Sequence, residues 1–367
     1  MSIWRWSDYF TKTPPQHRIT LGEGDTPVVR SRRLGATSGL DHLYFKLESS
    51  NPTGSYKDRF GAAAISDMLA QGKTLSIGTS SGNTGAAVAG YCAAAGIRCE
   101  IAILESAPLG KVKQMMAYGA NVYKVKGMGI DPEASDRTAE RLRRKAGRTD
   151  AKLQISAFKF SPEGMAGVQT IGYELHEQAA DPAGAFGGEG RIDHVFVQAG
   201  GGGLTWAVAR GFAGLVERGR LEVSPAVHCV QPDGNNTIAG PLRDGLDRGQ
   251  DCTCTSEVSG LQVGSVIDGH DVIPACRSTG GTGHVVTDEA VWAVQKRLAR
   301  EEGIFCEPAG AVSVVGALEA AQRGQIQRED RVVCLITGIG FKDPPAVDRM
   351  LEGMDCPTID VEQIDDI

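Results

Sequence analysis

The chain has 367 residues, 41% apolar and 23% charged, which is ordinary for a soluble globular protein and long enough for two domains. Thirty-eight Lys and Arg against 45 Asp and Glu give a net charge of −7, a mild excess that argues against a nucleic-acid partner. No apolar run is long enough to span a membrane or to form the core of a signal peptide, so we expect a cytoplasmic protein without a membrane partner.

The nine cysteines are an odd number and lack the spacing of a disulfide framework. Several, such as Cys92 and Cys229, lie in apolar stretches and are predicted to be small buried hydrophobes. Cys252 and Cys254 form a C-x-C pair in a polar loop, but no further ligands occur at a matching spacing. We therefore predict no metal site.

The segment Asn-Pro-Thr-Gly-Ser-Tyr-Lys-Asp-Arg at residues 51–59 is the most informative part of the chain. Its turn-forming residues deliver Lys57 to the start of a helix that Asp58 can help to begin. A lysine amine is nucleophilic only when deprotonated, and both burial and a helix N-terminus disfavour its protonated form. Lys57 is thus suited to a Schiff base with an aldehyde cofactor. A solvated lysine on a helix face is the alternative for any lysine taken alone.

From residue 74 onward, short apolar runs alternate with glycine-rich turns and helical stretches. Strands are expected at 75–78, 99–104, 121–125, 194–198, 227–230 and 332–336, helices at 86–95, 111–118, 132–144, 204–216, 287–302 and 309–321, and loops at 181–190 and 240–273. This alternation predicts parallel sheets covered by helices on both faces, in two α/β units with a cleft between them.

Three loops that follow predicted strands can hold polar ligands. The loop 78–85 contains Asn83 and presents hydroxyls and backbone N–H groups at a helix N-terminus, which suits a carboxylate or phosphate; a turn with purely local bonds is the alternative. The loop 198–204 contains four consecutive glycines whose amides can surround an anion. It has neither the ending of a Walker motif nor the dinucleotide fingerprint, so NAD binding is the weaker interpretation. In the third loop, the Thr337 hydroxyl can donate to a ring nitrogen or simply cap a turn.

Together these residues resemble the fold-type II pyridoxal-phosphate (PLP) enzymes, and within them the threonine synthases. The resemblance is carried by Gly24-Asp25-Thr26-Pro27-Val28, Lys46-Leu47-Glu48, residues 51–59, 81–85, 200–204 and 299–304, Glu307-Pro308-Ala309, and residues 337–344. It implies two doubly wound α/β domains of the tryptophan synthase β-like fold with the cofactor in the cleft. The large PLP-binding domain would comprise residues 1–59 and 160–367, and the small domain residues 60–159.

The resemblance also implies roles for individual residues. Lys57 would form the Schiff base, Asn83 would bond the 3′-oxygen of the cofactor, and Thr337 would meet its pyridine nitrogen. The cofactor phosphate would be bound by Gly200, Gly201, Gly202 and Gly203, the substrate carboxylate by Ser80, Ser81, Gly82 and Thr84, and the rest of the substrate by Ser156 and Lys159.

One segment departs from the pattern of the threonine synthases. Those enzymes typically carry Asn-Pro-Tyr-Arg-x-Glu-Gly, whereas residues 158–164 here read Phe-Lys-Phe-Ser-Pro-Glu-Gly. Ser161 takes the arginine position and Phe158 an asparagine position, both of which serve the substrate phosphate in that family. Lys159 offers a point charge but not the bidentate fork of an arginine.

The implied activity is that of a PLP-dependent carbon–oxygen lyase in threonine biosynthesis, which acts on a small amino acid and forms a homodimer. A threonine synthase converts O-phospho-L-homoserine and water to L-threonine and phosphate by elimination and water addition, with Lys57 shuttling the protons. Dehydration of serine or threonine, or β-replacement on an activated serine, is the alternative that fits the altered segment. A non-catalytic ligand-sensing protein is the third hypothesis.

Overall fold

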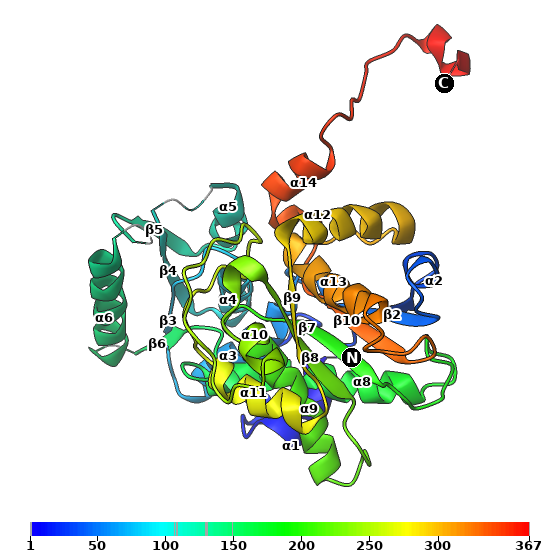
Figure 1. Cartoon of the computed structure of the whole chain (residues 1–367). Coiled ribbons are helices and arrows are strands. Elements are labelled where there is room, and N and C mark those ends of the chain that lie inside the picture. Colours follow the sequence, from blue (N-terminus) through cyan, green and yellow to red (C-terminus); the bar gives the residue numbers. More distant parts are fainter. Residues whose placement is uncertain (1, 106, 108, 129–130, 149, 367) are drawn as a thin grey trace.

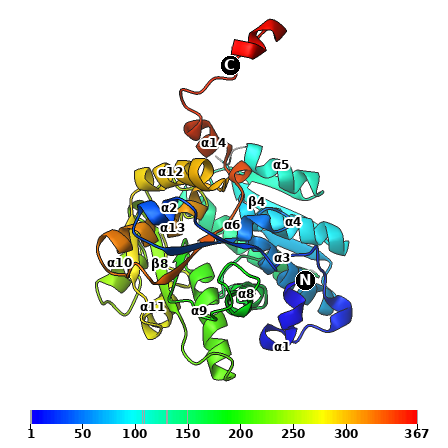
Figure 2. The same ribbon diagram turned by 90° about the vertical axis from the view of Figure 1, so that its right-hand side faces the viewer.

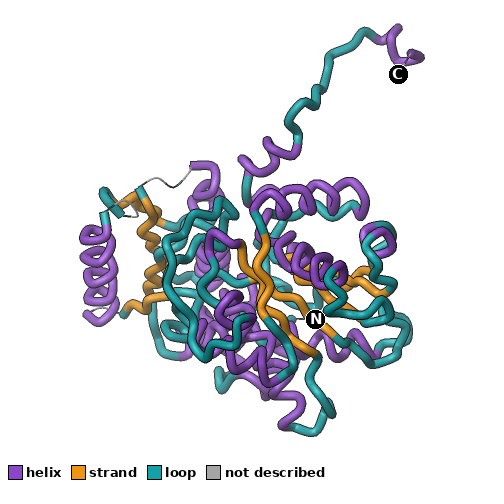
Figure 3. Tube along the Cα trace, viewed as in Figure 1, coloured by secondary structure: helices purple, strands orange, loops and turns teal. Residues whose placement is uncertain are grey.

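The computed structural model describes residues 2–105, 107, 109–128, 131–148 and 150–366, within which the strands form two sheets (Figures 1 and 3). The larger sheet has the order β1-β2-β10-β7-β8-β9 and the smaller one the order β5-β4-β3-β6. The bounds in the larger sheet are β1 Val28–Arg30, β2 His42–Leu47, β7 His194–Gln198, β8 Ala226–Pro232, β9 Gly283–Val286 and β10 Arg331–Ile336; those in the smaller sheet are β3 Leu75–Gly78, β4 Arg98–Leu104, β5 Asn121–Val125 and β6 Ala151–Gln154. All pairs are parallel except β1 with β2.

Helices cover both faces of the larger sheet, as its buried strands require. The helices are α1 Ser7–Phe10, α2 Leu34–Thr37, α3 Lys57–Ala70, α4 Asn83–Ala95, α5 Leu109–Ala117, α6 Pro132–Arg148, α7 Pro162–Val168, α8 Thr170–Ala180, α9 Gly203–Glu217, α10 Ala239–Arg243, α11 Gly269–Ser278, α12 Asp288–Arg297, α13 Pro308–Gln322 and α14 Pro344–Met350. Within β7, Val195 and Val197 face the core shared with α8, α9 and α11, whereas Phe196 faces the core shared with α12 and α13.

The six predicted strands and six predicted helices are all present, and the predicted fold of two doubly wound α/β units is confirmed. The loop predicted over 240–273 is wrong at its ends, because α10 continues to Arg243 and α11 begins at Gly269. In α11 the buried Val272, Ile273 and Cys276 form one apolar face, although Pro274 lies inside the helix. The predicted helix 287–302 ends as a π-helix over Leu298–Glu302.

The domain boundaries predicted near residues 59 and 159 fall between segments that contribute to different sheets, and they stay a prediction. Cys92 and Cys229 are buried and free, as predicted. No described helix is long and apolar enough to cross a bilayer. Residues 351–366 extend away from the body of the molecule in two perpendicular views (Figures 1 and 2).

Candidate active site

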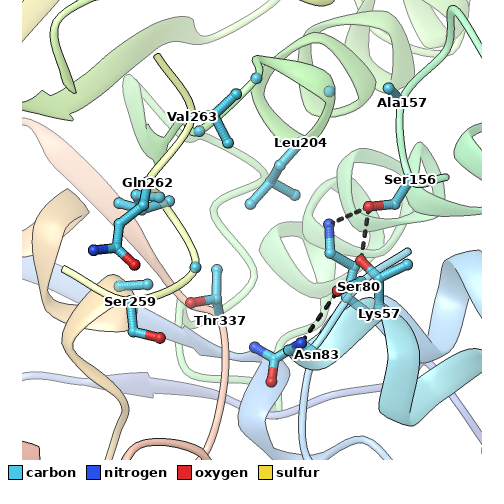
Figure 4. Close-up of a pocket in the computed structure, with 18 of the residues that line it drawn as sticks. Lys57, Ser80, Asn83, Ser156, Ala157, Leu204, Ser259, Gln262, Val263 and Thr337 are labelled. Atoms are coloured by element: carbon cyan, nitrogen blue, oxygen red, sulfur yellow. Dashed lines mark hydrogen bonds between the residues drawn. The ribbon is translucent and has the colours of Figure 1, made fainter. Parts of the chain in front are cut away.

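A cavity of about 510 Å³ opens where the carboxyl ends of the strands of both sheets meet (Figure 4). The small sheet contributes the loop 79–84 after β3 and the residues 154–157 at the end of β6. The large sheet contributes the loop 200–204 after β7, together with Thr337 after β10. This edge of a parallel sheet is where open α/β folds bind their ligands. The three loops and the lysine selected from the sequence therefore come together in one place.

The segment before α3 is held so that Lys57 becomes the first residue of the helix. Thr53 donates from its backbone N and from Oγ1 to the buried Asp58 carboxylate, at 2.9 and 2.8 Å. Asp58 thus organises the preceding turn, and burial raises its pKa to about 6. Gly54 has φ +90°, and an added Cβ there would lie 3.0 Å from Ile339, so this turn requires glycine.

Backbone bonds tie the same segment to the loop after β10. Tyr56 N donates to Thr337 O at 2.9 Å, and Ile339 N donates to Gly54 O at 3.0 Å. Lys57 and Thr337, which lie 280 positions apart in the sequence, are consequently held against one another by main chain rather than by flexible side chains.

The Lys57 amine is half-buried and surrounded by hydroxyl groups. Its Nζ donates to Tyr56 Oη and, at 2.9 Å, to Ser156 Oγ, which lies 2.8 Å from Thr84 Oγ1 (Figure 4). Desolvation lowers the pKa of Lys57 to about 7, although the nearby Glu307 and Asp268 oppose the shift. A large fraction of this amine is therefore an uncharged nucleophile near neutral pH.

A fully buried ion cluster fixes α3 two residues after Lys57. Arg59 donates to Glu48 Oε1 at 2.8 Å and to Glu174 Oε2 at 2.7 Å, and Lys46 Nζ donates to Glu174 Oε2 at 3.0 Å. All four side chains have no exposed surface. Burial by itself would raise the pKa of Glu174, but Arg59 and Lys46 hold it well below its usual range. The cluster thus consists of charged groups that stabilise one another.

The four-glycine loop forms a cradle that side chains would obstruct. Gly202 is the N-cap of α9 with φ +99°, and among the described residues no side chain caps this helix. An added Cβ on Gly202 would lie 2.8 Å from Val272 Cγ2, and one on Gly203 would lie 3.0 Å from Asp268 Oδ2. The uncapped amides at the positive end of the α9 dipole border the cavity, so the loop suits a phosphate group.

Asn83 and Thr337 both line the cavity, and both contact Glu307. Asn83 Nδ2 lies 3.0 and 2.9 Å from the two Glu307 carboxylate oxygens, and Thr337 Oγ1 donates to Glu307 Oε1 at 2.9 Å. Burial raises the pKa of Glu307, while the bonds from Asn83 and Thr337 and the charge of Lys342 oppose this shift.

The predicted substrate residues separate into two groups. Ser80, Ser81, Gly82, Thr84 and Ser156 line the cavity. Lys159 is exposed, lies outside the lining, and has its Nζ 5.7 Å from the ring centroid of Phe160. Its neighbours in the altered segment also have local roles: Ser161 Oγ accepts from Ile155 N at 3.2 Å, and the Phe158 ring packs on Trp206.

Sequence reasoning did not assign a function to three residues that shape the site. Asp268 accepts from Phe158 N at 2.8 Å and donates its own N to Gly201 O at 2.9 Å, so it joins the substrate segment to the glycine loop. Glu307 was noticed only as part of a motif. Gln154 is buried in the lining, and neither atom of its amide has a partner within the described residues. Only the position of Glu307 directly before a helix that starts with proline gave a local signal.

The fold and this site define a PLP enzyme of fold type II. The family model "Pyridoxal-phosphate dependent enzyme" matches residues 19–338, and the chain belongs to this family. It is 32% identical to a threonine synthase of Methanocaldococcus jannaschii over 96% of this chain and 83% of that protein, and 31% identical to one of Methanosarcina acetivorans over 100% and 85%. Among solved structures, maize serine racemase superimposes with a TM-score of 0.75 at 24% identity, covering 96% of this chain and 97% of that one.

The cofactor of this family is pyridoxal 5′-phosphate, and the cavity fits it. It offers a nucleophilic amine for the aldehyde, an uncapped helix terminus with glycine amides for the phosphate, and polar side chains between the two.

Proposed function

We propose that this chain is a PLP-dependent carbon–oxygen lyase of the threonine synthase type, which converts O-phospho-L-homoserine and water to L-threonine and phosphate. The observation that carries the proposal is the Lys57 amine, which has a pKa of about 7 and lies in a cavity lined by hydroxyl groups. The similarity to two threonine synthases over nearly the whole chain supports the assignment of the reaction. We further infer a cytoplasmic homodimer that acts in threonine biosynthesis.

In this proposal each part of the cavity has one task. The amides of Gly200, Gly201, Gly202 and Gly203 bind the cofactor phosphate, Asn83 and Thr337 meet its ring, and Lys57 holds its aldehyde. The cofactor supplies an electron sink for the charge left when a proton departs from the substrate. Ser80, Ser81, Gly82 and Thr84 bind the α-carboxylate through hydroxyl and amide groups at the start of α4.

Lys57 moves the protons. A pKa near 7 allows one amine to remove a proton from the α-carbon and to return it to another carbon of the same substrate. Ser156 Oγ is 2.9 Å from this amine and 2.8 Å from Thr84 Oγ1, so it orients Nζ toward the space in front of the carboxylate loop.

A second candidate is β-elimination from serine or threonine, or β-replacement on an activated serine. It is favoured by the lining of the cavity, where the cations among the described residues are Lys57 and Lys342. Lys342 Nζ already donates to Gln114 Oε1 at 2.7 Å. Reactions at the β-carbon require no second phosphate site, whereas the position of Lys159 outside the lining leaves the phosphate of phosphohomoserine without that cation.

The two candidates are separated by their products. We expect the PLP-loaded full chain to release phosphate from O-phospho-L-homoserine, whereas β-elimination would instead yield ammonia and 2-oxobutyrate from threonine. Lys57→Ala should abolish either reaction, while the matched substitution Lys124→Ala, at an exposed position in β5, should leave turnover unchanged. Absence of phosphate release at saturating substrate would exclude the threonine synthase assignment.

A further inference from the structure

Gln231 is a fully buried side chain that lies behind the four-glycine loop. It is near the end of β8, has no exposed surface, and lies outside the described lining of the cavity. Its Nε2 donates to Gly200 O at 3.2 Å and to Thr237 Oγ1 at 3.0 Å. Its Oε1 accepts from Ile238 N at 2.7 Å and from Ala239 N at 2.9 Å. Both N–H groups and the oxygen of this amide thus have partners, which fix its nitrogen on the side of Gly200.

The carbonyl oxygens of three consecutive glycines in the loop each accept a hydrogen bond. The donors are Gln231 Nε2 for Gly200, Asp268 N for Gly201 at 2.9 Å, and Trp206 N for Gly202 at 3.0 Å. None of the three donor residues belongs to the described lining of the cavity. Because a peptide unit is planar and trans, the N–H that follows each carbonyl points in the opposite direction. The amides of Gly201, Gly202 and Gly203 consequently face away from these donors, and all three residues border the cavity.

Only the first of these three bonds depends on a side chain. The backbone N atoms of Asp268 and Trp206 donate whatever side chain those positions carry, whereas the bond to Gly200 O requires the amide of Gln231. Neither Gly200 nor Gly201 has a side chain that resists rotation of the peptide between them. If that peptide turned over, the Gly200 carbonyl would present partial negative charge to the space assigned to the phosphate, in place of an N–H group.

We propose that Gln231 is a positioning residue that holds the peptide between Gly200 and Gly201 with its N–H directed at the cofactor phosphate. This rests on the proposed function in one respect, the assignment of the phosphate to the glycine loop, and does not depend on the identity of the substrate. Gln231 touches neither cofactor nor substrate and acts through the loop alone. Loss of its bond to Gly200 O should therefore weaken the binding of a ligand that carries a phosphate and spare a ligand that lacks one.

The test compares pyridoxal 5′-phosphate with pyridoxal, which has the same ring and aldehyde but no phosphate, in equilibrium dialysis with the full chain. Gln231→Met keeps a similar side-chain volume but cannot donate to Gly200 O. We expect this variant to bind pyridoxal 5′-phosphate about tenfold more weakly, which corresponds to one hydrogen bond, and to bind pyridoxal as the wild type does. Equal losses for the two ligands, or no loss for either, would overturn the proposal.

A matched substitution separates positioning from a general effect on the fold. Gln295 is also buried, and its Nε2 also donates to a backbone carbonyl, that of Cys306 at 2.8 Å. Gln295→Met should therefore leave the ratio of the two affinities at its wild-type value. A ratio lowered as much as in Gln231→Met would contradict the role given to Gln231.

A second variant separates the bond to the loop from the bonds to the start of α10. Gln231→Glu keeps an acceptor for Ile238 N and Ala239 N, but its carboxyl can donate to Gly200 O only while it is protonated. The preference of this variant for pyridoxal 5′-phosphate over pyridoxal should fall below that of the wild type as the pH rises from about 6 to about 9. A wild-type preference at every pH would show that the bonds to α10 matter instead, and would refute the proposal. A failed activity assay with phosphohomoserine would not affect these affinities.

Discussion

Replacing Lys57 by methionine should stabilise the cofactor-free protein, because the wild-type chain confines an amine where its charged form is poorly solvated. Burial lowers the pKa of this amine from its ordinary value of 10.5 to about 7. At about 1.4 kcal/mol per pKa unit, the cost to the folded state below pH 7 is at most about 5 kcal/mol. Methionine fills a similar volume but gives up the bond to Ser156, worth about 1 kcal/mol. We therefore expect a net gain of about 2–4 kcal/mol near pH 6.5.

The difference in stability between wild type and Lys57→Met should depend on pH in a definite direction. Between pH 7 and 10.5 the unfolded wild-type chain holds a proton that the folded chain has released, so wild-type stability rises with pH. The advantage of Lys57→Met should accordingly shrink over this range and vanish near pH 10.5. Urea unfolding of the two apoproteins at about pH 6.5, 8 and 10 measures the difference.

The exposed Lys124 on β5 provides the control, because Lys124→Met should cause no such pH-dependent change. The reasoning fails if Lys57→Met is less stable than wild type at neutral pH, or if its advantage is the same at every pH. A confirmed gain would show that the folded chain sacrifices stability to keep this amine reactive.

Three further perturbations follow from the structure. Arg59→Met leaves the buried Glu48 and Glu174 carboxylates without their partner, so we expect urea unfolding to show a loss of about 3–5 kcal/mol in the free energy of unfolding. Arg297→Met, in the partly exposed pair with Glu301, should cost less than about 1 kcal/mol. Equal losses in the two variants would contradict the role of burial. Gly202→Ala should lower cofactor affinity in equilibrium dialysis by about tenfold or more, because the added Cβ would lie 2.8 Å from Val272. Gly72 also has a positive φ, but no atom lies near the position of its added Cβ, so Gly72→Ala should leave the cofactor affinity unchanged. Burial lowers the pKa of His228 and brings that of His284 to about 4. Since the unfolded histidines take up protons below about pH 6.5, the free energy of unfolding should fall as the pH drops from there toward 4. His284→Gln should reduce this loss, and identical acid unfolding of both proteins would contradict the prediction.

The sequence predicted the strands with uninterrupted apolar runs, such as β7 and β10, because both faces of these strands are buried. It failed for β1, β2, β6 and β9, which are three to six residues long and each carry a polar residue, Arg30, Lys46, Lys152 or His284. The polar residues in such short strands remove the periodic signal on which the prediction depends.

The residues of the site also fall into a group that the sequence predicted and a group that it did not. Lys57, Asn83 and the four glycines stand in loops whose composition has a local chemical meaning, and the structure brings them to one cavity. Glu307 contacts Asn83 across 224 positions and Thr337 across 30, and Asp268 contacts Phe158 across 110. Nothing in the neighbours of Glu307 and Asp268 in sequence shows these contacts. The exposed position of Lys159 is likewise set by how the segment 156–161 packs against Trp206 and Asp268.

The placement of β10 between β2 and β7 has a consequence for synthesis on the ribosome. The small sheet is complete once residue 154 has emerged, but the large sheet lacks an interior strand until residues 331–336 have been translated. Because domains tend to fold as units from the N-terminal side, we expect the nascent chain to expose an unpaired β2 edge for most of its translation time. Chaperones that shield such edges would then determine how much functional protein a cell obtains.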